Sequence, residues 1–368
     1  MKTYDIAAYI WPAYTGSEPR TRIFWPEGIG EWQTVKRDHT KPAHGYTWER
    51  KPLWGYVDEA DPHVMEMQID EATKHGVNVF IYDWYWYDGR PFLEQCLNNG
   101  FLKAKNCADM RFYIMWANHN ANYTWDYRNS STLDTDIWQG AVTPMQFREV
   151  GLRWLTQYFT LDNYYTIDGE PVVAIYDIAN FFNGLGGIDA AAAEMQWLRD
   201  EARKHGLPGV HFQLIKWGDT PVNLSGVDGG AVAVSPELVH RLGFRSLTHY
   251  QIVHFTDVTR DYAEILPDMV KEWKQTRDTF AIPYFPHVSI GWDNNPRFTA
   301  FRPEITTNNP PAEFEKALRE AKAFCDENCI TPLITVNSWN EWTESSYLEP
   351  DNVYGYGYLD AIKRVFCE

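Results

Sequence analysis

Two glutamates near the C-terminal end of the chain, Glu341 and Glu344, have the type and spacing to do chemistry. They are three residues apart, stand beside Trp339 and Trp342, and follow an apolar run typical of a buried strand. On a strand they would point to opposite faces, whereas on a helical turn their Cβ atoms would lie about 5–6 Å apart. Cleavage of a glycosidic bond uses two carboxyl groups, about 5–5.5 Å apart for retention and about 6.5–9.5 Å for inversion. A helical turn here predicts a retaining pair, and a solvated polar face is the alternative.

The elements that must position this pair alternate between apolar strands and amphipathic helices. Strands are expected at 6–10, 77–82, 111–116, 172–176, 211–216, 251–254, 282–288 and 333–336, with a further one possible between 230 and 234. Helices are expected at 61–75, 144–159, 189–205, 262–279, 311–325 and 358–365. The repeated units predict an α/β fold, a single (β/α)8 TIM barrel with long aromatic-rich βα loops, forming one catalytic domain over residues 1–368.

A doubly wound open sheet is the alternative architecture. It is disfavoured because no glycine-rich phosphate-binding motif follows the first strand. A long irregular stretch, residues 11–56, follows that strand instead, and connections of this length in a compact enzyme usually shape a site.

Aromatic and hydrogen-bonding residues gather where the expected strands end, which in a barrel is the active-site face. The candidates for substrate contacts are Tyr9, Trp11, Asp83, Tyr85, Trp86, Asn118, His119, Tyr176, Trp292, Asp293, Trp339 and Asn340. Each has a structural alternative: Asp83 as a loop cap, His119 as a satisfied buried group, and the aromatic rings as rim packing. Asp293 is also expected to pair with Arg297 and brace the seventh loop, and Glu349 to shape the turn before Pro350.

The composition agrees with a sugar-handling site. The 368 residues include 17 Trp, 22 Tyr and 19 Phe, and 50 acidic against 33 basic residues give a net charge of −17. Sugar rings stack their C–H faces on aromatic rings and bond their hydroxyls to carboxylates, although a ring-rich core in an ordinary acidic enzyme would look similar. The acidic balance argues against nucleic acid and anionic membrane surfaces as partners, and no apolar run reaches about 18 residues.

Neither a metal site nor a compartment is marked in the sequence. The five cysteines form no CxxC pair and have no completing histidine or aspartate pattern, so no metal and no cofactor are expected. The N-terminus lacks a basic segment followed by a long apolar one, so no signal peptide is expected. The compartment stays open between the cytoplasm and, for a trimmed chain, the periplasm or exterior.

Several motifs resemble one family of proteins. The run Trp339-Asn340-Glu341-Trp342-Thr343-Glu344, followed by Leu348-Glu349-Pro350, resembles the signature of glycoside hydrolase family 99, and still more the family-99-like WbsX proteins once called glycosyltransferases. The other segments that agree are Gly55 to Asp58 with Asp61-Pro62, Gly76 to Trp86, Trp116-Ala117-Asn118, Tyr164 to Tyr176, and Gly291 to Asn294 with Pro296-Arg297.

The resemblance implies a metal-free barrel that cleaves a manno-configured (mannose- or rhamnose-like) oligo- or polysaccharide with retention, through a 1,2-anhydro sugar. Matched by motif, Glu341 would take the proton from the sugar 2-OH, and Glu344 would protonate the leaving oxygen and then activate water. Thr343 stands where the family usually has His, Ser345 replaces Gly, and the loop from Asp83 to Asp88 differs. Endo-mannosidase specificity is therefore not carried over. The alternatives are a WbsX-like glycosyltransferase of polysaccharide biosynthesis and a non-catalytic carbohydrate-binding protein.

Overall fold

Parallel strands at the centre of the molecule close into a barrel. The computed structural model describes residues 3–132, 135–218, 222–223, 231–232 and 234–368. In the order of their pairing, the barrel strands are β1 (Asp5–Ile10), β2 (Val79–Tyr87), β4 (Arg111–Trp116), β8 (Glu170–Ile175), β9 (His211–Ile215), β12 (Ser246–Thr248), β13 (His287–Ser289) and β14 (Leu333–Asn337), which pairs again with β1. The ring closes between β12 and β13, where Leu247 forms a parallel bridge with Tyr284. The predicted (β/α)8 barrel is confirmed.

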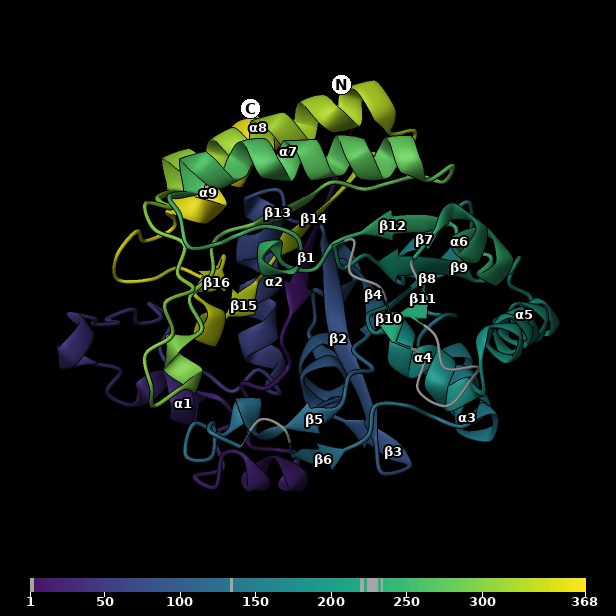
Figure 1. The fold of residues 1–368 in the computed structure, drawn as a ribbon, viewed down its shortest axis with the longest axis horizontal. Coiled ribbons are helices and arrows are strands. Elements are labelled where there is room, and N and C mark those ends of the chain that lie inside the picture. Colours follow the sequence, from purple (N-terminus) through teal and green to yellow (C-terminus); the bar gives the residue numbers. More distant parts are fainter. Residues whose placement is uncertain (1–2, 133–134, 219–221, 224–230, 233) are drawn as a thin grey trace.

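Helices cover the outside of the barrel (Figure 1). They are α1 (Trp32–Lys36), α2 (Pro62–Lys74), α3 (Pro144–Gln157), α4 (Ile178–Leu185), α5 (Ile188–Lys204), α6 (Pro236–Leu242), α7 (Tyr262–Thr279), α8 (Pro311–Asn328) and α9 (Gly357–Phe366). Helices α7 and α8 lie side by side along one edge of the view, and α3 to α6 group on another side. None of the described helices is long and apolar enough to cross a membrane.

Local sequence explains where these elements begin and what they bury. Helix α2 starts after Asp61, whose carboxylate accepts a hydrogen bond from the backbone N–H of His63 at 2.9 Å, and Pro62 fills the first helical position. All nine residues of β2 are buried, as expected for a strand of a parallel sheet covered on both faces. The barrel core is therefore continuous from its interior to the surrounding helices.

Eight further short strands of the described residues lie outside the barrel ring. They are β3 (Arg90–Phe92), β5 (Ala121–Asn122), β6 (Asp136–Trp138), β7 (Thr166–Ile167), β10 (Val222–Asn223), β11 (Ala231–Val232), β15 (Asn340–Glu341) and β16 (Ser346–Tyr347). The strand expected between 230 and 234 corresponds to β11, and positions 230 and 233 lie outside the described residues. The stretch 11–56 is irregular apart from α1 and two 3₁₀ turns, Pro19–Ile23 and Pro42–His44.

The prediction of the sixth strand was wrong. The segment expected as a strand, 251–254, holds a 3₁₀ turn (Ile252–His254), and the strand is β12, a few residues earlier. Strand β12 lacks an apolar run because Ser246 and Thr248 point into a polar part of the barrel. There they bond to His211 at 2.8 Å and Thr335 at 2.8 Å. Strand β13 is likewise shorter than the predicted 282–288 and begins at His287.

Candidate active site

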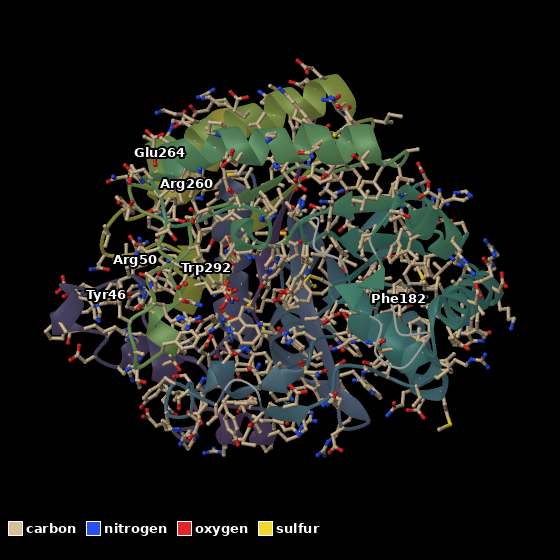
Figure 2. The ribbon with its side chains drawn as sticks, viewed as in Figure 1. Tyr46, Arg50, Phe182, Arg260, Glu264 and Trp292 are labelled. Carbon is tan, nitrogen blue, oxygen red and sulfur yellow. The ribbon has the colours of Figure 1, made fainter. Side chains whose placement is uncertain are left out.

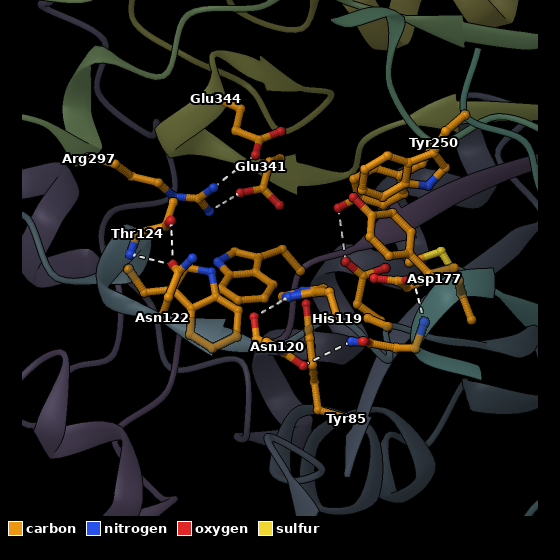
Figure 3. Close-up of a pocket in the computed structure, with 18 residues that line it drawn as sticks. Tyr85, His119, Asn120, Asn122, Thr124, Asp177, Tyr250, Arg297, Glu341 and Glu344 are labelled. Atoms are coloured by element: carbon orange, nitrogen blue, oxygen red, sulfur yellow. Dashed lines mark hydrogen bonds and ion pairs between the residues drawn. The ribbon is translucent and has the colours of Figure 1, made fainter. Parts of the chain in front are cut away.

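A pocket of about 420 Å³ opens at the end of the barrel where the strands terminate. Its wall draws on the segments that follow most of the barrel strands, together with a 3₁₀ turn, Asn295–Arg297. The lining residues are Trp11, Asp83, Tyr85, Met115, Ala117, His119, Asn120, Asn122, Thr124, Trp125, Tyr176, Asp177, Asn180, Trp217, Tyr250, Arg297, Glu341 and Glu344. Figure 3 shows Arg297, Glu341 and Glu344 on one wall and Asp177 and Tyr250 on the other.

The two glutamates stand on a tight turn that follows β14. Glu341 ends the short strand β15, and Glu344 lies on the next 3₁₀ turn (Trp342–Glu344). Ser345 ends this turn with φ of 54°, and β16 then returns to pair with β15. This geometry directs both carboxyl groups into the same pocket, and both residues are buried.

One guanidinium joins the pair. Arg297 donates from one terminal nitrogen to Glu341 at 2.6 Å and from the other to Glu344 at 2.8 Å. Its Nε donates to Glu31 at 2.9 Å, and Glu31 is completely buried. Three buried carboxylates therefore share one cation, which leaves the cluster with surplus negative charge.

That surplus raises the pKa of both pocket glutamates. Burial, followed by the charge of Glu344, raises the pKa of Glu341 well above its usual value, and Arg297 only partly opposes this. Burial also raises the pKa of Glu344, while Arg297 works in the opposite direction. Both shifts favour retention of a proton by the pair, compared with two solvent-exposed glutamates.

The long stretch 11–56 completes this wall. Trp11 donates its indole N–H to Glu31 at 2.5 Å, and its backbone N–H donates to the side chain of Asn340 at 2.8 Å. Asn340 in turn donates to Trp11 and to Glu59, both at about 3 Å. These bonds fix β15 against the residues that follow β1, so the carboxyl pair is held from two sides.

Asp83 brings a third carboxyl group to the pocket from β2. Its Oδ2 accepts a hydrogen bond from the hydroxyl of Tyr250 at 2.9 Å. Its Oδ1 is buried and accepts no hydrogen bond from the described residues. Burial raises the pKa of Asp83 well above its usual value, with Glu344 adding to the rise. This carboxyl group is therefore placed to bond a ligand hydroxyl.

Side chains that follow β4 form another part of the pocket wall. His119 is enclosed by the rings of Tyr85, Trp125 and Tyr176, and its Nδ1 lies 2.8 Å from the carbonyl of Asn120. Burial lowers the pKa of His119, which favours a neutral ring with Nδ1 as donor and Nε2 as acceptor. A neutral imidazole in this position suits a ligand hydroxyl better than an ionised group.

The structure brings together some of the sequence-predicted residues and separates others. Those that line the pocket are Glu341, Glu344, Trp11, Asp83, Tyr85, His119 and Tyr176. Those that do not line it are Tyr9, Trp86, Asn118, Trp292, Asp293, Trp339 and Asn340. The residues of the second group lie outside the lining of this pocket.

Three residues of the second group support the pocket from inside the protein. Tyr9 is buried in the barrel and donates its hydroxyl to the carbonyl of His249 at 3.0 Å. Asn118 accepts from the backbone of Asp177 and donates to its carbonyl, each at 2.7 Å. Asn340 accepts a hydrogen bond from the backbone N–H of Trp11 and donates one to its carbonyl. Each acts on a wall residue or on the barrel and not on the cavity itself.

The other aromatic candidates lie elsewhere. Trp339 is fully buried against Phe80 and donates to Gln68 at 3.1 Å. Trp86 lines a separate depression beyond β5 and β6. Trp292 is half-buried, and Figure 2 places it on the same side of the molecule as Tyr46, away from Phe182.

The expected pairing of Asp293 with Arg297 was wrong. Asp293 accepts hydrogen bonds from Tyr46 at 2.8 Å and from the side chain of Asn295 at 2.8 Å. Arg297 is drawn away from it by the three buried carboxylates. Glu349 also does more than shape a turn, because its buried carboxyl accepts from Trp342 at 2.6 Å.

Several wall residues were missed by the sequence reading. Glu31, which supports the wall through Arg297, comes from a loop whose approach depends on the closed barrel, and only the ring-rich, charged composition of 11–56 indicated it. Arg297 was named, but with Asp293 as its partner. Tyr250 was hidden by the misplaced sixth strand, since it follows β12 directly. Asn120 and Asn122 followed a predicted strand and carried a usable signal. Within the described residues, no group of three or more His, Cys, Asp or Glu could hold a metal ion.

Comparison with known proteins agrees with this architecture. A protein described as glycoside hydrolase-like superposes with a TM-score of 0.62 at 13% identity, covering 100% of this chain and 94% of that one. The GH99 endo-α-mannosidase from Bacteroides thetaiotaomicron superposes with a TM-score of 0.57 at 15% identity, covering 98% and 95%. At such low identities these matches establish the fold.

Sequence comparison establishes the family. The model of the family described as glycosyltransferase WbsX matches residues 6–362. The fold and the family match together define the class of protein, a TIM barrel of the family described as glycosyltransferase WbsX. The chain belongs to the WbsX family.

Two curated relatives match this chain along about half of their own length. The uncharacterized protein WxcX of Xanthomonas campestris pv. campestris, in strains ATCC 33913 and B100, is 25% identical over 350 residues. The match covers 94% of this chain, but the chain spans only about half (47%) of those relatives.

Proposed function

We propose that this protein is a retaining glycoside hydrolase that cleaves a neutral, manno-configured glycan. The observation that carries the proposal is the buried pair Glu341 and Glu344, joined by Arg297 at the mouth of a TIM barrel. Catalytic groups of such barrels come from the C-terminal ends of the strands, which is where this turn lies. Hydrolysis of a glycosidic bond by this route needs two carboxyl groups in one pocket.

The resemblance to family 99 supports a division of labour between the two groups. Glu341, as carboxylate, takes the proton of the sugar 2-OH while O2 attacks the anomeric carbon. Glu344, as carboxylic acid, gives its proton to the leaving oxygen, and a 1,2-anhydro sugar results. Glu344 then takes a proton from water, which opens the anhydride at the anomeric carbon, and Glu341 returns its proton to O2. The two inversions give net retention.

The electrostatics of the pocket support the starting state of this scheme. One proton must rest on the pair. Burial raises both pKa values in that direction, and the charges of Glu344 and Glu31 add to the rise at Glu341, while that of Glu31 adds to the rise at Glu344. Arg297 approaches Glu341 more closely, at 2.6 Å against 2.8 Å for Glu344. Its charge stabilises the ionised form of either carboxyl, and the assignment of the base to Glu341 and of the proton to Glu344 comes from the resemblance to family 99.

The charge of the wall favours a neutral glycan. Among the described residues that line the pocket, Arg297 is the only Lys or Arg, and its N–H groups are already taken up by carboxylates. The undescribed positions 219–221 and 224–230 contain no Lys or Arg either. Asp83 and Asp177 add two further acidic side chains to the wall and no cation. An anionic sugar or a pyrophosphate would meet repulsion there.

A substrate screen with defined variants tests the proposal. Wild-type protein is incubated with α- and β-linked mannosides, rhamnosides and gluco-configured controls, and proton NMR records the first anomer released. We expect cleavage of one manno- or rhamno-configured series, with the anomeric configuration of the product matching that of the substrate. An inverted first product, or cleavage of gluco-configured substrates alone, would contradict the proposal.

Substitution of each glutamate tests its role separately. Glu341→Gln and Glu344→Gln should each lower kcat by about 10²–10⁴ while the circular dichroism spectrum is retained. Glu201→Gln, the same chemical change on the outer helix α5, serves as the matched control and should leave turnover unchanged. Wild-type turnover in either pocket variant would end the assignment.

The family description favours a second candidate, a glycosyltransferase that uses a sugar donor. Calorimetry with GDP-mannose, a nucleoside diphosphate sugar, separates the two. Binding of the donor with transfer of its sugar to an acceptor glycan would support the second candidate. Cleavage of a glycan in water with no binding of the donor would support the first. Glycan binding with neither reaction would instead indicate a carbohydrate-binding protein.

A further inference from the structure

One tryptophan of this ring-rich chain is left open to solvent, at the rim of the pocket. All 17 tryptophans lie in the described residues, and Trp217 is the only one with more than a third of its surface exposed, at 41%. It directly follows β9 and lines the pocket. Leaving so large an apolar surface in water is unfavourable, so its placement beside a cavity points to a binding role.

The ring of Trp217 is held from behind. His254 stacks on it with ring centroids 4.4 Å apart and planes inclined by 10°, and the edge of Tyr176 meets it at 4.9 Å. His254 is half-buried, and desolvation of its ring lowers its pKa to about 3, so the supporting imidazole is uncharged. His254 covers one face of the indole, and 41% of the Trp217 surface stays exposed beside the pocket. A rigid aromatic face of this kind loses little freedom when a flat apolar surface settles on it.

The strand order places this platform across the barrel mouth from the carboxyl pair. Around the closed ring, β8 is four strands from β14 in either direction, and β9 is its neighbour. Glu341 and Glu344 follow β14, whereas Tyr176 and Asp177 follow β8 and Trp217 follows β9. Figure 3 shows Asp177 across the cavity from the two glutamates. A ligand that reaches from one wall to the other therefore passes from the carboxyl pair to the platform.

We propose that Trp217 is the stacking platform of a second sugar subsite, so that the pocket engages at least two rings of an oligo- or polysaccharide. This inference rests on the proposed function for the place of the reacting ring, at Glu341 and Glu344. The second ring lays the C–H groups of one face on the indole. The carboxylate of Asp177, on the same wall of the pocket, offers an acceptor for its hydroxyls.

Calorimetry with glycans of increasing length tests the subsite. The probes are methyl α-mannoside, α-linked mannobiose and mannotriose, and the corresponding rhamnose series. We expect the wild-type protein to bind the two- and three-ring probes more tightly than the one-ring probe. Trp217→Ala should lose that gain, about tenfold in Kd, and keep its affinity for the single ring.

Two further variants separate stacking from folding. Trp217→Phe keeps a smaller aromatic face and should retain part of the gain. Trp197→Ala removes a half-buried tryptophan from the outer helix α5 and should behave as wild type. Near-ultraviolet circular dichroism reports whether the other rings keep their packing.

The outcomes distinguish this inference from the proposed function. Equal affinities of Trp217→Ala and wild type for the longer probes would overturn the subsite, and so would a wild-type protein that binds none of the probes or shows no gain with length. Length-dependent binding lost in Trp217→Ala, but without hydrolysis, would support the subsite and contradict the hydrolase. Glycan hydrolysis by wild-type protein, with length-dependent binding unchanged in Trp217→Ala, would support the hydrolase and contradict the subsite.

Discussion

Arg297 contacts three buried carboxylates at once and therefore sets both their positions and the charge around them. Arg297→Lys would keep the charge but replace a planar fork by a single ammonium, which cannot meet three carboxylates in the same geometry. We expect kcat to fall by about 10²-fold, the size of effect that a displacement near 1 Å produces. Arg302→Lys, in the same loop and half-exposed, is the matched control. Unchanged kcat in Arg297→Lys would show that the clamp has no part in turnover.

The charge of Arg297 also predicts a shift in pH dependence. It lowers the pKa values of Glu341 and Glu344 against the larger effect of burial, so its removal in Arg297→Met should raise them further. The acidic limb of the profile of kcat/KM against pH, which reports ionisation of the base, should move to higher pH. A limb that stays in place, or moves to lower pH, would contradict the electrostatic role. Because three carboxylates lose their cation, thermal unfolding must first show that this variant is folded.

At the scale of elements, Asn340 ties the short strand β15 to the segment after β1. Asn340→Ala would leave the backbone N–H of Trp11 without its acceptor and would take a donor from Glu59. Each buried group that loses its partner costs about 1–3 kcal/mol, so the free energy of unfolding should fall measurably in urea titrations. We also expect kcat to fall more than KM rises, because the loosened strand carries Glu341. A loss of stability with unchanged kcat would limit Asn340 to a structural role.

The elements also show what the sequence could and could not predict. Apolar runs such as β2 and amphipathic helices such as α8 follow local patterns, and their positions were predicted within a few residues. Strand β12 was missed because its inward side chains, Ser246 and Thr248, serve a polar barrel interior that exists only after closure. The glutamate pair was found because its two members are close in sequence. The pairing of Arg297 was predicted wrongly because its partners in the structure, such as Glu341 and Glu31, lie 44 to 266 positions away in the sequence.

At the scale of the whole molecule, buried carboxyls and buried histidines impose opposite pH dependences on stability. Burial lowers the pKa of His39 to about 4 and those of His211 and His254 to about 3. These histidines take up protons near pH 6.5 only when the chain unfolds, so they destabilise the native state as pH falls below that value. At pH 6.5 such a histidine is still about half protonated in the unfolded chain, so this opposing contribution fades between about pH 6.5 and 7.5.

Buried carboxyls with raised pKa values affect stability at higher pH than these histidines do. Burial raises the pKa of Glu59 to about 7 and those of Asp83, Glu341 and Glu349 well above their usual values. A carboxyl with a raised native pKa stabilises the fold fully below its unfolded value, near 4, and this contribution is lost as pH rises through the native pKa. Each unit of elevation is worth about 1.4 kcal/mol. These carboxyls hold protons in the native state that they have lost in the unfolded chain, so they make the free energy of unfolding fall as pH rises from 6.5 to 8.

We therefore expect Tm to decrease steadily from pH 6.5 to 8 in calorimetric scans at constant ionic strength. Asp83→Asn is the variant that isolates one contributor, since its amide oxygen can still accept from Tyr250 while its N–H₂ takes the place of the unpartnered Oδ1. It should flatten the decrease and raise Tm at pH 8 relative to wild type. The same change at Asp200, an exposed residue of α5, should alter neither. A wild-type Tm that rises between pH 6.5 and 8 would show that these carboxyls are ionised in the native protein, and the protonated starting state assigned to the glutamate pair would lose its electrostatic basis.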